Sequence, residues 1–274
     1  MNTFEKYEFD RLGYLVIEDM LKPEEAKSMK AAVDEIEEHA LANLSKPPRK
    51  DSPWGWGQYH QSHERGYHAA GEKAQGKSLI IEDFWNASSA FDILINHAKT
   101  MEYISPIIQG TTTINNSEIR IRYPQNATSA HMGGPISHKY RYAFTNGEID
   151  CMMVRMVYFL HDVGPDQGPF SVVPATHKSN WNTPYKDRGP DDEPGMVGLP
   201  VKAGDAILFT EHLRHGGLIN RSEQTRKTLH VGYGPPWMMS QNIATGDEVP
   251  YITPQTRKRL TAEQNKLFVF RKTG

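Results

Sequence analysis

Cysteine is nearly absent from this chain: Cys151 is the single one among 274 residues. One thiol cannot form an intramolecular disulfide, so a disulfide framework and a cysteine-based zinc site are both excluded. Because Cys151 stands at the start of an apolar run, we expect a buried structural thiol and not a nucleophile.

Charge of one sign and long apolar runs are also lacking. Lys and Arg number 31 against 33 Asp and Glu, a net charge of −2, so bulk charge does not favour a nucleic-acid polymer as partner. No apolar run approaches the ~18 residues that a membrane-spanning helix needs, and residues 1–6 lack the apolar core of a signal peptide. We therefore expect a cytoplasmic protein with no membrane partner.

Three common catalytic motifs are missing as well. The chain has no Walker-type phosphate loop, no dinucleotide-binding glycine fingerprint and no Gly-x-Ser-x-Gly nucleophile elbow. What is present is an ordinary globular composition, 38% hydrophobic and 23% charged, in a chain long enough to bury a core without cross-links. We expect a single domain over residues 1–274.

Helical periodicity is found towards the two ends of the chain. Apolar residues recur three and four positions apart at Ala26, Met29, Val33, Ile36 and Ala40. A second helical stretch follows Ser88, and Thr261–Gln264 fits a capping box near the C-terminus. These patterns predict a helical N-terminal part over about residues 1–110 and a helical C-terminal tail.

Residues 47–76 interrupt the predicted helical part with many Gly, Trp, Tyr and His residues. Two interpretations stay open for so long a segment: a surface loop with a few aromatic anchors, or a lid over a site.

Short β-rich runs dominate the middle of the chain. They are separated by Gly, Pro, Asn and Asp clusters, and they cover residues 119–123, 152–160, 171–174, 206–209 and 228–233. Regular short strands after a helical region favour an antiparallel sandwich over βαβ units. The predicted β core spans about residues 111–240.

Two histidines lie at the edges of predicted strands and could meet at the mouth of such a sandwich. His131 follows one strand and a short loop, whereas His215 ends another strand and has His212 as its rival. The alternation of Ile119–Arg122 places Arg120 and Arg122 on one face of a strand. That face points either to solvent or to the interior, where the arginines would bind an anion.

Five segments, in their order along the chain, resemble the phytanoyl-CoA dioxygenase family of iron(II)- and 2-oxoglutarate-dependent oxygenases. They are residues 13–19, 160–170, 172–178, 203–217 and 220–226. The resemblance covers roughly residues 13–234. It implies a mainly β fold with flanking helices, a double-stranded β-helix (a cupin-like jelly roll), with iron held at one end.

Carried over position by position, the resemblance makes His131 the first iron ligand and His215 the distal one. It makes Arg226 the residue that grips the distal carboxylate of 2-oxoglutarate, and we add Arg122 as a second cofactor-binding candidate. The implied cofactors are Fe(II), 2-oxoglutarate and O2.

The sequence departs from the family at Gly133. The usual site has two histidines and one carboxylate, with the carboxylate two positions after the first histidine, and glycine has no side chain to bind iron. Three explanations remain open: loss of iron chemistry, a carboxylate from elsewhere such as Glu148 or Asp150, or an anion in the open position. The His-x-Gly pattern is similar to that of iron/2-oxoglutarate halogenases, in which chloride takes that place.

This second resemblance implies a halogenase that chlorinates an unactivated aliphatic carbon of a freestanding small molecule, with chloride as a further cofactor. The sugar of an adenine nucleotide is one candidate substrate. The alternatives are an iron/2-oxoglutarate hydroxylase and a non-catalytic small-molecule binding protein. No docking feature for a carrier protein is evident in the sequence.

Overall fold

The computed structural model describes residues 1–53, 57–132, 142–185, 188–238, 245 and 250–269. Gly133, the proposed open chloride position, lies outside the described residues.

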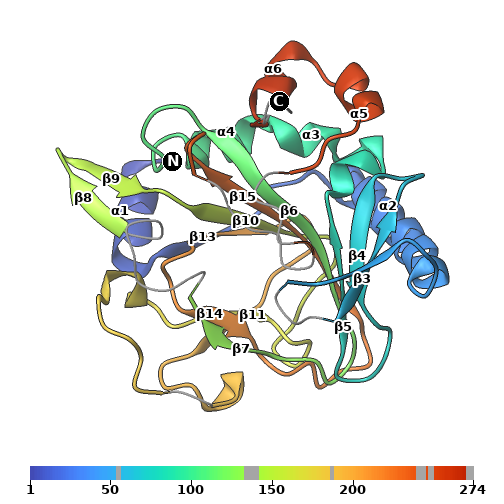
Figure 1. The fold of residues 1–274 in the computed structure, drawn as a ribbon. Helices are drawn as coiled ribbons and strands as arrows, with labels where there is room; N and C mark the ends of the chain where they lie inside the picture. Colours follow the sequence, from blue (N-terminus) through green and yellow to red (C-terminus); the bar gives the residue numbers. More distant parts are fainter. Residues whose placement is uncertain (54–56, 133–141, 186–187, 239–244, 246–249, 270–274) are drawn as a thin grey trace.

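The larger of two facing sheets is antiparallel throughout and has nine described strands (Figure 1). In spatial order they are β1 (Tyr14–Ile17), β13 (Ala206–Thr210), β10 (Val154–Phe159), β15 (Arg226–Gly234), β6 (Thr113–Arg122), β5 (Ser78–Glu82), β4 (Tyr67–Gly71), β3 (Gln58–Ser62) and β2 (Arg49–Asp51). The long pair β6 and β15 forms the centre of this sheet.

A smaller antiparallel sheet lies opposite it (Figure 1). Its strands are, in order, β12 (Val197–Leu199), β11 (Phe170–Val172), β14 (His215–Gly217) and β7 (Thr128–His131). A separate hairpin consists of β8 (Tyr142–Thr145) and β9 (Glu148–Cys151). Two facing antiparallel sheets with flanking helices confirm the predicted jelly-roll fold.

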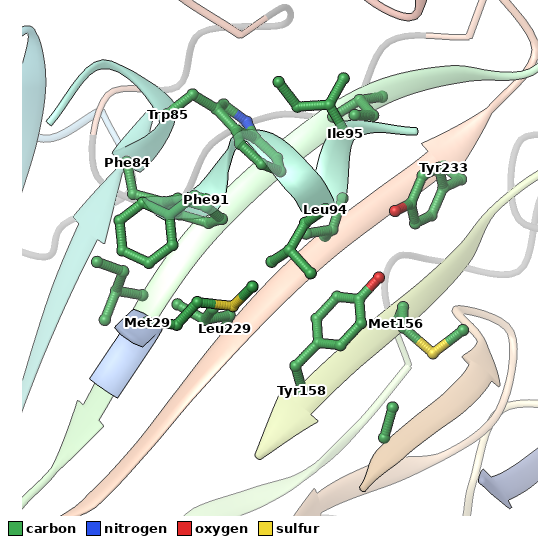
Figure 2. Packing of buried hydrophobic residues seen from close by; sticks show 14 of the residues in the cluster. Met29, Phe84, Trp85, Phe91, Leu94, Ile95, Met156, Tyr158, Leu229 and Tyr233 are labelled. Atoms are coloured by element: carbon green, nitrogen blue, oxygen red, sulfur yellow. The ribbon is translucent and has the colours of Figure 1, made fainter. Parts of the chain in front are cut away.

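The helices pack on the outer face of the larger sheet. They are α1 (Thr3–Leu12), α2 (Pro23–Asn43), α3 (Asp92–Ile95), α4 (Ala98–Ile104), α5 (Pro254–Arg259) and α6 (Ala262–Lys266). Figure 2 shows Met29 of α2 and Leu94 of α3 beside Leu229 and Tyr158 of the sheet. Burying each such side chain contributes about 1.5–3 kcal/mol, so this cluster anchors the helices. No helix among the described residues is long and apolar enough to cross a membrane.

Strand alternation sends every second residue of β15 inward. Leu229, Val231 and Tyr233 belong to the outer cluster beneath the helices, so Arg226, Thr228 and His230 face the smaller sheet. A second apolar cluster fills part of the space between the sheets and includes Val157, Phe159, Val172, Ile207 and Phe209. Buried polar side chains occupy the rest of this interior and form the candidate site.

Two expectations differ from the structure. Residues 1–110 contain the expected helices α1–α4 but also β1–β5, so the larger sheet starts much earlier than predicted. The described parts of residues 47–76 are neither a loop nor a lid, because β2, β3 and β4 extend the larger sheet there. Cross-strand pairing of β4 with β5, of β3 with β4 and of β2 with β3 decides their structure, and local sequence carries little sign of it.

Candidate metal and anion site

His131 and His215 face each other across neighbouring strands of the smaller sheet. His131 ends β7 and His215 begins β14, and the antiparallel register pairs the two residues directly. Their ring centroids are 4.4 Å apart. His212 is also buried, but it precedes β14 and is not the partner of His131 in the register.

Backbone carbonyls fix the protonation of both rings. Nδ1 of His131 lies 2.8 Å from the Ser129 carbonyl, and Nδ1 of His215 lies 2.8 Å from that of Leu213. A carbonyl oxygen only accepts, so each Nδ1 carries the hydrogen and each Nε2 keeps its lone pair. Burial lowers the pKa of both rings, and the neighbouring His131 lowers the pKa of His215 further. Two neutral imidazoles in this tautomer are a fitting donor pair for a divalent transition metal.

Phenylalanine rings support the buried histidine. The ring of Phe170 stacks on that of His215 at 5.7 Å and 17°, and the Phe209 ring centroid is 4.6 Å away. These contacts fix the orientation of His215 and keep water away from one side of the pair.

A third ligand does not join the two histidines within the described residues. No group of three or more His, Cys, Asp or Glu side chains there could hold a metal ion. Glu148 and Asp150, one of the explanations for the missing carboxylate, lie on β9 of the separate hairpin. Sequence alone places Gly133 two positions after His131.

Arg122 and Arg226 occupy paired positions on β6 and β15. Like charges directly opposite each other destabilise a sheet, so this pair favours an anion between the two groups. Burial and Arg226 lower the pKa of Arg122, and burial lowers the pKa of Arg226 to about 10. Arg226 Nη1 donates to the Gly168 carbonyl, which holds the guanidinium in place.

Buried polar atoms without a hydrogen-bond partner, together with Gly217, line a small cradle next to Arg226. Nε of Arg122, Nε of Arg226 and Oγ1 of Thr128 are buried without a hydrogen-bond partner. A Cβ atom on Gly217 would lie 3.5 Å from Nη2 of Arg226 and 3.8 Å from Oγ1 of Thr128. Buried polar groups are normally satisfied, so these residues fit a bound carboxylate. The family resemblance predicts that this carboxylate is the distal one of 2-oxoglutarate.

A charged network lines the interior beside the histidines. Arg120 Nε lies 2.5 Å from Glu118 Oε2, Arg155 Nη1 lies 3.7 Å from Glu118 Oε1, and Arg155 Nε pairs with Glu211. Arg155 Nη1 also donates to Asn116 Oδ1 at 2.5 Å. Arg120 thus faces inward, but it is engaged by Glu118. Arg155 and Glu211 are not predicted as site residues from the sequence, although Arg155 is a lone charge in the apolar run 152–160 and so a usable signal.

A groove of about 500 Å³ opens beside β7. Its lining includes Ser129, Ala130, Tyr185, Arg188 and Arg214. The guanidinium carbon of Arg188 lies 5.4 Å from the centroid of the Tyr185 ring, a cation–π arrangement. The groove adjoins the residues that precede His131.

Other conspicuous residues have structural partners. His161 Nε2 accepts from the Lys227 backbone at 2.9 Å, and His177 Nε2 contacts the Asp10 carbonyl at 3.0 Å. Cys151 is buried beside Thr210, and burial raises the pKa of its thiol to about 11. The predicted structural role of this thiol agrees with that environment.

Comparison of the chain with models of protein families gives one match. The family model described as Phytanoyl-CoA dioxygenase (PhyH) matches residues 9–228 of the chain. No curated protein matches the chain in a sequence comparison.

Several solved structures are similar in fold. HygX from Streptomyces hygroscopicus, with nickel and 2-oxoglutarate bound, has a TM-score of 0.69 and 18% identity, and the match covers 88% of this chain and 90% of that one. The carbocyclase SnoK from nogalamycin biosynthesis has a TM-score of 0.58 and 17% identity, covering 95% and 91%. The epimerase SnoN, in complex with Fe3+, alpha ketoglutarate and nogalamycin RO, has a TM-score of 0.54 and 15% identity, covering 87% and 85%.

Proposed function

This chain belongs to the phytanoyl-CoA dioxygenase family of iron- and 2-oxoglutarate-dependent oxygenases, and we propose that within this family it is a halogenase. The proposed reaction is the chlorination of an unactivated aliphatic carbon of a freestanding small molecule. The proposed cofactors are Fe(II), 2-oxoglutarate, chloride and O2.

The observation that carries this proposal is a pair of facing histidines, our proposed metal ligands, with no carboxylate beside them among the described residues. His131 and His215 are in register with both Nε2 lone pairs available, and no third ligand joins them among the described residues. The sequence has Gly133 where the usual carboxylate stands. An exogenous anion is therefore the simplest way to complete the donor set.

Charge balance supports chloride as that anion. Fe(II), two neutral imidazoles and the 2-oxoglutarate dianion sum to zero, so a carboxylate ligand would bring the site to −1. Chloride brings it to the same value. The lowered pKa of both histidines keeps the imidazoles neutral, as this balance requires.

We assign a role in this reaction to each of the site residues. His131 and His215 would hold the iron, and Arg226 with Arg122 and Thr128 would bind and orient the far carboxylate of 2-oxoglutarate. Bound iron, with 2-oxoglutarate and dioxygen, supplies the oxidising power that removes a hydrogen atom from an unactivated carbon. Phe170 and Phe209 exclude water beside His215, and the substrate-binding residues must place the carbon nearer to chloride than to the source of a hydroxyl group.

For the substrate we propose a molecule with a planar and an anionic part, of which an adenine nucleotide is the example to test first. Tyr185 in the groove beside β7 can stack on a base, and Arg188 can bind a phosphate. Hygromycin B, which is bound in a HygX structure, belongs in the same screen.

Mass spectrometry of the product tests the proposal. Protein supplied with Fe(II), 2-oxoglutarate, O2 and chloride should convert its substrate to a product with the isotope pair of one chlorine, and bromide should shift the mass accordingly. A product that is only hydroxylated at saturating chloride would favour the hydroxylase alternative. Absence of both product and succinate across the screen would favour the binding protein.

A further inference from the structure

Glu211 is a buried carboxylate on the segment that leads from β13 into His215. It is 3% exposed and directly follows β13. Its ion-pair partner Arg155 stands opposite Phe209 in the register of β10 against β13, and the ring of Phe209 packs on His215 at 4.6 Å. Glu211 is therefore close to the histidine pair, yet it does not form a metal-binding group with it in the described structure.

Arg155 of β10 holds Glu211 through a buried ion pair. Arg155 Nε pairs with Glu211 Oε1, while Arg155 Nη1 donates to Asn116 Oδ1 at 2.5 Å. On the same side Glu118 Oε1 lies 3.7 Å from Arg155 Nη1, and Glu118 is itself bound by Arg120. Arg155 is thus fixed from β6, and it acts as a rigid anchor for the carboxylate.

We propose that Arg155 is a positioning residue that keeps Glu211 off the open coordination position of the metal. The inference rests on the proposed function, because a guarded position is needed only where an exogenous anion must bind. A carboxylate is the ligand type that the two histidines lack, so an unrestrained Glu211 would compete with chloride. Pulling Glu211 away from Arg155 would break a buried ion pair and leave the guanidinium with the more distant carboxylate of Glu118, at 3.7 Å, which is unfavourable. The ion pair therefore makes the position selective for an anion from solution.

Anion binding to the Co(II)-loaded protein, with 2-oxoglutarate present, tests this inference without turnover. Azide and chloride titrations are followed through the visible ligand-field bands of Co(II). The variants are Arg155→Leu, Arg155→Lys, Glu211→Gln and the double variant Arg155→Leu/Glu211→Gln. The free glutamate of Arg155→Leu should bind the metal, so azide affinity should fall at least tenfold, about 1.4 kcal/mol. The Co(II) bands should shift even without azide.

The other variants separate positioning from a general structural role. Arg155→Lys keeps a cation for Glu211 and should bind azide as the wild type does, to within a few-fold. Removing Glu211 from the Arg155→Leu protein should restore azide binding, because no competing carboxylate remains. Azide binding in Arg155→Leu equal to that of the wild type would overturn the inference, and so would loss of Co(II) binding in Glu211→Gln alone. A wild-type protein that binds neither anion would instead contradict the open position, and with it the proposed halogenase.

Discussion

Gly217 lies directly against the guanidinium of Arg226: a methyl group at this glycine would stand 3.5 Å from Nη2. The adjacent Gly216 has a different neighbour, because its methyl group would lie 2.7 Å from the Thr128 backbone carbonyl. The first contact is ordinary van der Waals distance, whereas the second is a clash with backbone. The two glycines of one strand therefore serve different purposes, space for a ligand at Gly217 and strand packing at Gly216.

A pair of alanine variants tests this distinction. Gly217→Ala should fold normally but narrow the cradle, so the KM for 2-oxoglutarate should rise several-fold. Gly216→Ala forces β7 and β14 apart and should lower the melting temperature by about 4 °C or more, since 1 kcal/mol shifts Tm by roughly 2–4 °C in a domain of 150–250 residues. Thermal unfolding and 2-oxoglutarate titrations measure both effects. Equal loss of stability in the two variants would contradict the cradle.

Arg226→Met is expected to separate cofactor binding from folding. Charge-assisted hydrogen bonds contribute about 1.5–3 kcal/mol, so 2-oxoglutarate should bind roughly 10- to 100-fold more weakly. Without 2-oxoglutarate the variant should be as stable as the wild type or more so, because the repulsion between Arg226 and Arg122 is gone. Isothermal titration calorimetry measures the affinity for 2-oxoglutarate, and a thermal shift without 2-oxoglutarate measures the stability of the variant. A variant that is destabilised and still binds 2-oxoglutarate normally would assign Arg226 a purely structural role.

Acid sensitivity should follow from the buried histidines. Burial lowers the pKa of His177 to about 4, whereas an unfolded histidine titrates near 6.5. Between these values the unfolded chain binds more protons, so stability falls as the pH drops from about 6.5 towards 4. His215 and His230 have pKa values lowered in the same direction by burial.

The His177→Gln variant isolates the contribution of one histidine to the dependence of stability on pH. It removes the titrating ring beneath Gly13, so its metal-free stability should vary less with pH, by up to about 3 kcal/mol over this range. Urea unfolding at a series of pH values measures it, with the exposed position His63→Gln as control. If the free energy of unfolding varied with pH in the same way for the wild type and His177→Gln, His177 would not be a source of the acid sensitivity.

The parts of the fold that the sequence predicted are those with strong local signals. β6 contains the alternation of Ile119–Arg122, β10 and β15 are short runs with β-branched and aromatic residues, and α2 has clear apolar periodicity with Pro23 in its first turn. β2–β4 were missed because Arg49–Asp51 is wholly exposed and the next two strands are rich in His and Tyr. Their structure depends on successive pairing outward from β5, first by β4, then by β3 and β2, and this pairing is not a local property.

The candidate site also has a part that was named from the sequence and a part that depends on strand register. The family resemblance named His131, His215 and Arg226, and the structure brings the two histidines together; their roles in binding stay predictions. The network around Arg155 did not, because Arg155 and Glu211 meet only through the register of β10 against β13. The opposition of Arg122 and Arg226 likewise depends on the register of β6 against β15. Such registers are set by packing between strands far apart in sequence.

Gly133→Asp is the substitution that separates halogenation from hydroxylation. Aspartate two positions after His131 recreates the usual set of two histidines and one carboxylate, so its side chain should take the place proposed for chloride. The variant should bind Fe(II) and 2-oxoglutarate at least as well as the wild type but lose chlorination. In its place we expect either a hydroxylated product or no product, since a small displacement of the substrate carbon is costly. Gly133→Ala is the matched control, because it adds a side chain without a ligand atom and should retain chlorination. Product mass spectrometry with succinate release as the measure of turnover distinguishes these results, and a Gly133→Asp protein that chlorinates as well as the wild type would place the anion elsewhere.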